Sequence, residues 1–148
     1  MTPTRSILLV EDNPDDAELT LRAFEKNKIA NRVVHVTDGE QALDYLFAAG
    51  QHQGRDPRTN PTVVLLDLKL PKVSGLDVLR RMRTDPRTRR LPVVVLTSSN
   101  EERDLVASYD LGANSFVRKP VDFAQFMEAA HHLGLYWLVL NEQPGGDG

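Results

Sequence analysis

Five short runs of apolar, β-branched residues alternate along the chain with amphipathic stretches. In three of the runs the apolar residues are almost continuous, which is typical of strands buried on both faces of a parallel sheet. This alternation predicts an α/β fold in which right-handed crossovers place helices on both faces of the sheet. The runs are Ser6–Val10, Arg32–Val36, Thr62–Leu66, Pro92–Thr97 and Ser115–Arg118.

The stretches between the runs carry signals for helix starts. Pro14 suits the first position of a helix, and the acids Asp15 and Asp16 favour its first turn. Asp38 predicts an N-cap, and Gln41, three residues later, completes a capping box. The remaining starts are expected at Ser74, Asn100 and Asp122.

Two segments do not follow this alternation. Residues 50–60 are polar and have no periodicity, which predicts an exposed loop. The apolar stretch Leu135–Leu140 follows the last expected helix. We expect one domain over residues 1–135 and an apolar extension with a frayed tail over residues 136–148. An apolar patch of this kind predicts a homodimer through the last helix and the tail, and the alternative is that it folds back on its own domain.

Composition limits the class of protein. A chain of 148 residues, 41% hydrophobic and 26% charged, can form the core of one globular domain. It has no cysteine, which excludes disulfides, thiolate zinc sites and cysteine nucleophiles. Neither a signal peptide nor an apolar run long enough to cross a bilayer is visible. With a net charge of −3, the basic cluster at residues 80–90 fits a solvated helix face better than a nucleic-acid surface. We therefore expect a cytoplasmic protein with neither a membrane nor a nucleic-acid partner.

Polar residues gather where the predicted strands end. Glu11 and Asp12 follow the first strand, Asp67 follows the third, Thr97 closes the fourth and Lys119 follows the fifth. Ligands of such sheets bind beyond the carboxyl ends of the strands, so these groups are expected on one rim. Three clustered carboxylates repel one another, and one ammonium with one divalent cation would balance them. Mg²⁺ suits the rim because it prefers oxygen ligands, whereas a softer metal would need a thiol or a histidine there.

Each rim residue also has an ordinary explanation when it is taken alone. An Asp after an apolar run is usually a turn residue or a helix cap. Thr97 alone would be an ordinary buried hydroxyl, and Lys119 alone would be a surface charge. Their joint placement at four strand ends favours a common site.

In its motifs and in their order, the chain strongly resembles the receiver domains of bacterial response regulators. The resemblance runs from about Arg5 to about Leu133. It implies a flavodoxin-like (βα)5 three-layer sandwich, with a five-stranded parallel sheet in the order 2-1-3-4-5. The motifs are residues 9–13 (LVEDN), residues 65–71 (LLDLKLP), Gly75, residues 96–98 (LTS) and residues 116–120 (FVRKP).

The resemblance also implies a role for each rim residue. Asp67 would be the phosphoacceptor, taking a phosphoryl group from a histidine kinase. Asp12 and Asp67 would bind Mg²⁺ directly together with the backbone carbonyl of Lys69, and Glu11 would bind it through water. Lys119 would pair with one phosphoryl oxygen. These roles agree with the general chemistry of phosphoryl transfer, in which positive charge neutralises the equatorial oxygens.

A conformational switch is the second implication of the resemblance. Thr97 would hydrogen-bond another phosphoryl oxygen, and the aromatic ring of Phe116 would move inward with it. The chain would then be a single-domain regulator that relays a signal. It would not be an enzyme, although it would assist its own phosphorylation and dephosphorylation.

A narrower resemblance concerns the partner. The loop at residues 50–60 and the ending Leu135–Leu140 are similar to the single-domain regulators paired with bacterial and cyanobacterial phytochromes. This predicts a sensor histidine kinase as the partner, and more narrowly a bacteriophytochrome.

Two other functions are compatible with parts of the pattern. A phosphatase of the haloacid dehalogenase class would need a second Asp two residues after the nucleophile, where this chain has Lys69. A pseudo-receiver, which binds partners without phosphorylation, would be expected to lack members of the set, and all are present. Lys69 also departs from the small or amide side chain that the family often has there, so we expect it to alter the lifetime of the phosphoryl group.

Overall fold

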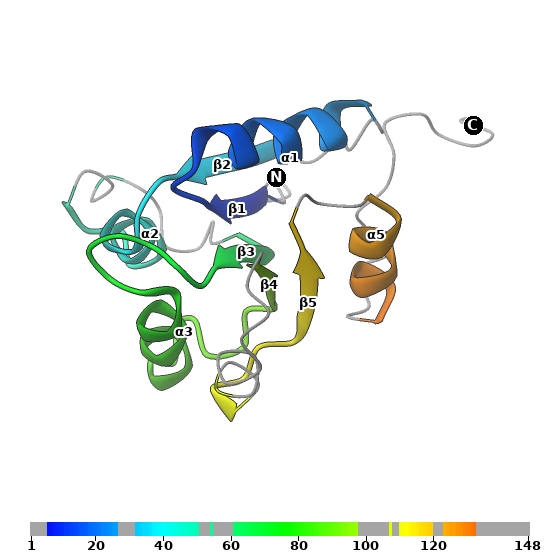
Figure 1. Ribbon diagram of the computed structural model, residues 1–148. Helices are drawn as coiled ribbons and strands as arrows, with labels where there is room; N and C mark the ends of the chain where they lie inside the picture. Colours follow the sequence, from blue (N-terminus) through cyan, green and yellow to red (C-terminus); the bar gives the residue numbers. More distant parts are fainter. Residues whose placement is uncertain are drawn as a thin grey trace.

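The computed structural model describes residues 6–26, 32–50, 54, 61–97, 107, 110–119 and 123–132. In these ranges five parallel strands form one sheet in the order β2-β1-β3-β4-β5, as the resemblance implied (Figure 1). The third and fourth strands each begin one residue later than the sequence predicted, and the third includes Asp67. The strands are β1 (Ser6–Val10), β2 (Arg32–Val36), β3 (Val63–Asp67), β4 (Val93–Thr97) and β5 (Ser115–Arg118).

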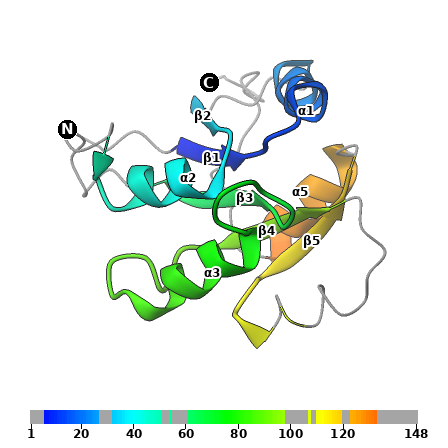
Figure 2. The same ribbon diagram turned by 60° about the vertical axis from the view of Figure 1, so that its left-hand side comes forward.

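Helices cover both faces of the sheet, which confirms the three-layer sandwich (Figure 2). Because side chains alternate along a strand, Leu8 faces the core under α2 and α3, whereas Leu9 faces the core under α1 and α5. Both residues are fully buried, which explains the continuous apolar runs in the sequence. The described helices are α1 (Pro14–Lys26), α2 (Gly39–Leu46), α3 (Gly75–Thr84) and α5 (Phe123–His132).

The expected caps at Asp38 and Ser74 are present, with one difference in detail. The Asp38 carboxylate accepts the N–H of Gln41 at 2.7 Å and begins α2, and Ser74 caps α3 in the same way. The Gln41 side chain does not reach back to the N–H of Asp38. It accepts the N–H of Thr37, one residue earlier, at 3.1 Å. The reciprocal capping box is therefore displaced by one residue.

The basic cluster at residues 80–90 is solvated except at Arg83. This side chain is half-buried and donates to the Gly112 carbonyl at 2.8 Å and to the Asn114 side chain at 3.1 Å. Burial lowers the pKa of Arg83. The Arg83 side chain therefore links the end of α3 to the segment before β5, a role that the sequence pattern did not indicate.

Several expectations fall on residues outside the described ranges. These are the helix starts at Asn100 and Asp122, most of the loop at residues 50–60, and the extension over residues 136–148. Among the described helices, none is long and apolar enough to cross a membrane.

Candidate functional site

The three carboxylates of the rim lie at the ends of two strands, β1 and β3. The N–H of Glu11 bonds the Val36 carbonyl at 3.0 Å and so extends the β1–β2 pairing by one residue. This places Glu11 in the interior, where it is fully buried, and leaves Asp12 exposed at the mouth of the site. Asp67 closes β3 and is 5% exposed. One carboxylate oxygen from each of Glu11, Asp12 and Asp67 lies within 4.8 Å of the others.

The Asp67 carboxylate is held at both oxygens. Its Oδ1 accepts the backbone N–H of Lys69 at 3.1 Å, and its Oδ2 accepts the Lys119 ammonium at 3.0 Å. Behind it, α3 begins directly against the strand end. A Cβ at Gly75 would lie 2.3 Å from the Asp67 carbonyl oxygen, so only glycine permits this approach. The backbone and one cation therefore fix the orientation of this carboxylate.

Lys119 is the buried cation of the site. Its Nζ lies 2.9 Å from Glu11 Oε1, 3.0 Å from Asp67 Oδ2 and 3.0 Å from Asp16 Oδ2, and its side chain is 7% exposed. Burial disfavours the ammonium, but the hydrogen bonds to Glu11, Asp16 and Asp67 outweigh it and raise the pKa of Lys119. Lys119 is therefore a permanent positive charge between the ends of β1 and β3.

One ammonium does not neutralise the carboxylates around it. Burial raises the pKa of Glu11 to about 7, with a further rise from the negative charge of Asp67, although the hydrogen bond from Lys119 opposes both. Burial is the main cause of this rise, and the nearby charge of Asp67 adds to it. The site offers only oxygen ligands and an excess of negative charge, which fits a hard divalent cation such as Mg²⁺.

The structure therefore brings together Glu11, Asp12, Asp67 and Lys119, as expected. Lys69 lies two residues after Asp67, and its backbone N–H donates to the Asp67 carboxylate. The roles implied for all of these residues stay predictions, as do those of Thr97 and Phe116. The backbone of Thr97 closes β4, but its side chain lies outside the described part of the structure. Phe116 is half-buried on β5 and packs against the core under α2 and α3.

Among the described residues at the rim, Asp16 is one that the sequence pattern did not indicate. It was interpreted only as an acid that favours the helix dipole. Side chains on a helix tilt toward its N-terminus, so an acid in the first turn of α1 can reach back to the end of β1. That geometric rule is the signal that could have identified it.

Comparisons with known proteins agree with this geometry. The model of the "Response regulator receiver domain" family matches residues 7–131. The solved structure of the bacteriophytochrome response regulator AtBRR is 57% identical, with a TM-score of 0.85 over 95% of this chain and 100% of that chain. The bacteriophytochrome response regulator RtBRR is 55% identical, with a TM-score of 0.84 over 97% of this chain and 86% of that chain.

A curated relative extends the similarity to cyanobacteria. Response regulator Rcp1 of Synechocystis is 35% identical over 92% of this chain and 90% of its own length. A structure of the Mn²⁺-bound form of Rcp1 has a TM-score of 0.74 and 32% identity over 95% of this chain and 99% of that chain. With the family model, the sheet order and the acidic rim in agreement, the chain belongs to the response regulator receiver family and is a two-component response regulator.

Proposed function

We propose that Asp67 is the phosphoacceptor of this regulator and takes its phosphoryl group from a histidine kinase in a Mg²⁺-dependent reaction. The observation that carries the proposal is the position of the Asp67 carboxylate. It ends a buried strand, lies beside the Lys119 ammonium, and shares the rim with Glu11 and Asp12. Asp67 is itself the last residue of its strand, whereas Glu11 and Asp12 follow theirs.

The proposed step is a substitution at phosphorus. An electron pair of an Asp67 carboxylate oxygen forms the new P–O bond of an acyl phosphate. The P–N bond of the kinase phosphohistidine breaks, and its electron pair stays on the imidazole nitrogen, which takes a proton from water. The Lys119 N–H that now points at Asp67 Oδ2 is placed to pair with a phosphoryl oxygen, so little reorganisation is needed.

The residues that would hold Mg²⁺ are Asp12 and Asp67 directly, with the Lys69 carbonyl, and Glu11 through water. The excess negative charge at this rim supports the assignment. When bound, the ion supplies positive charge that allows an anionic phosphoryl group to approach the carboxylates. Asp12 is exposed, so it can exchange water for metal without unfolding any element.

We further propose that Thr97 and Phe116 relay the phosphorylated state. Thr97 closes the strand beside β3, where a phosphoryl group on Asp67 offers new acceptor oxygens. These oxygens give Thr97 a contact that exists in only one of two states, which is what a switch requires. Phe116, at the edge of the α2 and α3 core, would move inward as Thr97 does.

We infer that the phosphodonor is a bacteriophytochrome histidine kinase. The support is the identity above one half with two bacteriophytochrome response regulators over almost the whole chain. The proposal places the exchange in the cytoplasm, where the ATP that phosphorylates such kinases is made. Phosphotransfer from a purified bacteriophytochrome kinase, compared in red and far-red light, tests this donor. Equal transfer in both lights would contradict it.

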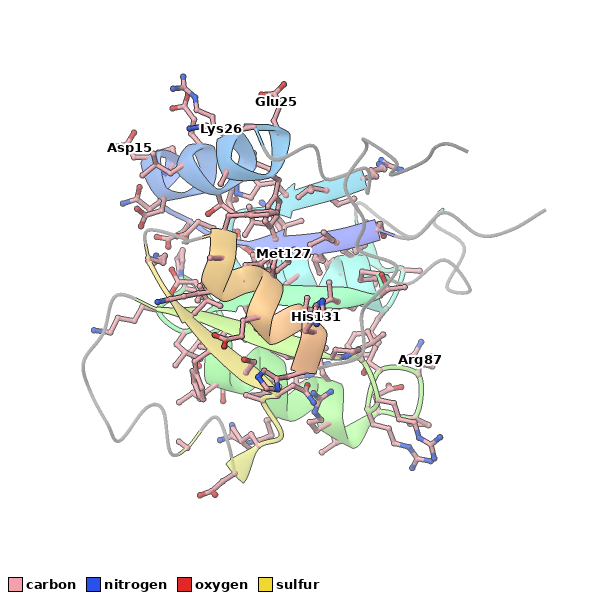
Figure 3. All side chains as sticks on the ribbon, turned by 90° about the vertical axis from the view of Figure 1, so that its right-hand side faces the viewer. Asp15, Glu25, Lys26, Arg87, Met127 and His131 are labelled. Atoms are coloured by element: carbon pink, nitrogen blue, oxygen red, sulfur yellow. The ribbon has the colours of Figure 1, made fainter. Side chains whose placement is uncertain are left out.

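We also infer a homodimer through α5 and the extension over residues 136–148. A shallow hollow on α5 is lined by Met127, Glu128 and His131. Figure 3 shows Met127 and His131 on this helix. An apolar extension follows this helix in the sequence. Sedimentation of the wild type against the double variant Trp137→Ala/Leu138→Ala decides the point. Dimers of equal affinity in both proteins would remove the extension from the interface.

The central test is phosphorylation by a small acyl phosphate in the presence and absence of Mg²⁺. Wild type should be labelled with Mg²⁺, Asp67→Asn should not, and Asp12→Ala should require a much higher Mg²⁺ concentration. Wild type that stays unlabelled with both the acyl phosphate and a phosphorylated kinase would make the chain a pseudo-receiver. Labelling of Asp67→Asn at the wild-type level would reject Asp67 as the acceptor.

A further inference from the structure

Asp16 contacts the phosphate-pairing lysine although it belongs to a helix and not to a strand end. Its Oδ2 lies 3.0 Å from Lys119 Nζ, as close as the oxygen of Asp67. The Asp16 side chain is 30% exposed, whereas those of Glu11 and Asp67 are 0% and 7% exposed. Lys119 therefore has two buried partners and one at the edge of solvent.

The number of donors on the ammonium matches the number of its partners. A lysine has three N–H donors and no acceptor. Glu11 accepts hydrogen bonds from Nζ at 2.9 and 3.2 Å and Asp67 accepts one at 3.0 Å, and Asp16 Oδ2 lies 3.0 Å from Nζ as an ion-pair partner. Contacts with three carboxylates restrain a charge on a flexible four-carbon side chain more than contacts with two.

Asp16 itself is held by local structure. The Asn13 side chain accepts the N–H groups of Asp15 and Asp16 at 2.9 and 3.0 Å and so fixes the first turn of α1. The residue after Asp16 is Ala17, which is buried in the core under α1 and α5. The helix therefore presents the Asp16 carboxylate to the rim from a fixed base.

We propose that Asp16 is a positioning residue, which holds the Lys119 ammonium at the place where it meets the incoming phosphoryl group. The inference rests on the proposed function of Asp67. When Asp67 becomes an acyl phosphate, the donor that pointed at Asp67 turns to a phosphoryl oxygen. The contacts with Glu11 and Asp16 stay in place, so the ammonium keeps its position while the charge next to it changes.

A second possible effect of Asp16 would change the phosphorylation rate in the opposite direction. If its negative charge acted only by repelling the anionic phosphodonor, removal of the charge would accelerate phosphorylation. If it held Lys119 in place, removal would slow the reaction. The direction of the rate change therefore separates the two effects.

The experiment measures the rate of phosphorylation by acetyl phosphate at saturating Mg²⁺. Loss of a whole preorganised donor costs roughly 100-fold or more, so a donor that is present but loosened should cost about 3- to 10-fold in Asp16→Ala. Asp16→Glu keeps the charge and should retain most of the rate. Asp15→Ala removes the same charge from the same helix turn, at an exposed position (Figure 3), and should stay within about twofold of wild type.

A double-mutant cycle with Lys119→Met shows whether Asp16 acts through the lysine. Two residues that act as a unit are not additive, so Asp16→Ala should change the rate of Lys119→Met by less than about twofold. The Nζ–H signal of Lys119 in ¹⁵N NMR is an independent measurement. It should be visible in wild type and Asp15→Ala, where slow exchange reflects contact with three carboxylates, and lost in Asp16→Ala. Asp16→Asn, which keeps the side-chain shape, replaces Asp16→Ala in both measurements if the latter does not fold.

These outcomes separate the inference from the function on which it rests. Wild type that is labelled on Asp67, with Asp16→Ala as fast as Asp15→Ala or faster, overturns the positioning role alone. The positioning role is also overturned if Asp16→Ala lowers the phosphorylation rate by the same factor in the wild-type background and in Lys119→Met. Wild type that accepts no phosphoryl group overturns the proposed function, and the positioning role with it.

Discussion

Replacement of Lys119 by Met should destabilise the protein, and the loss should depend on pH and on Mg²⁺. The change leaves Glu11, which is fully buried, and Asp67, which is 5% exposed, without their cation. Removing one partner of a buried ion pair costs about 3–5 kcal/mol in the free energy of unfolding. For a chain of this size a loss of about 3 kcal/mol lowers the melting temperature by roughly 6–12 °C.

The pH dependence follows from Glu11. Its folded-state pKa is raised to about 7, so the stability it contributes is present at low pH and is lost as the pH rises through that value. Without Lys119 its pKa should rise further, because the opposing hydrogen bond is gone. Below pH 7 Glu11 takes up a proton and is no longer an unpaired charge. The free energy of unfolding lost in Lys119→Met should therefore be larger near pH 8 than near pH 6.

Urea unfolding in EDTA at the two pH values measures this loss, and a repeat in Mg²⁺ should restore more stability to the variant than to wild type. Lys72→Met is the matched control. Lys72 is 62% exposed and lies 3.5 Å from Glu40 and 3.9 Å from Asp38, so its loss should cost under about 1 kcal/mol. The reasoning is refuted if both variants lose the same stability at both pH values.

Two further predictions concern the metal and the loop beside the site. Mg²⁺ affinity should fall as the pH drops below about 7, because the ion must displace a proton from Glu11. Calorimetric titrations near pH 6 and pH 8 measure this affinity, and equal values would contradict the prediction. Gly39→Ala should destabilise the protein by about 1–3 kcal/mol, because its Cβ would lie 2.0 Å from the Val73 carbonyl oxygen. Gly54→Ala, where no atom lies within 4 Å of the added Cβ, is its control in thermal unfolding, and equal melting temperatures would contradict the clash.

Hydrophobic patterning predicted the fold almost completely. The runs Ser6–Val10 and Ser115–Arg118 are strands with the expected bounds, and the alternation with helices yields the parallel sheet. Burial on both faces is a property of each strand alone, so it can be recognised locally. The strand order is not local, and it entered through the family resemblance.

The rim was predictable for a similar reason, because the carboxyl ends of parallel strands share one edge. Glu11, Asp67 and Lys119 each follow or end a strand, and the structure brings both carboxylates within about 3 Å of the Lys119 Nζ. Asp16 and Arg83 were missed because their roles depend on where a helix packs against the sheet. Each is a charged residue in a helix, and a linear pattern cannot distinguish one that points inward from one in solvent.

Chemical mapping of the phosphoryl group tests the central claim most directly. Wild type is phosphorylated by a histidine kinase with Mg²⁺ and reduced at once with borohydride, which converts a phosphorylated aspartate to homoserine. Peptide mass spectrometry then locates the product. We predict homoserine at position 67 and at no other aspartate, with none in a parallel sample that lacks Mg²⁺. Homoserine at Asp12 or Asp16 in place of Asp67, or a stable phosphate on a residue other than aspartate, would contradict the account.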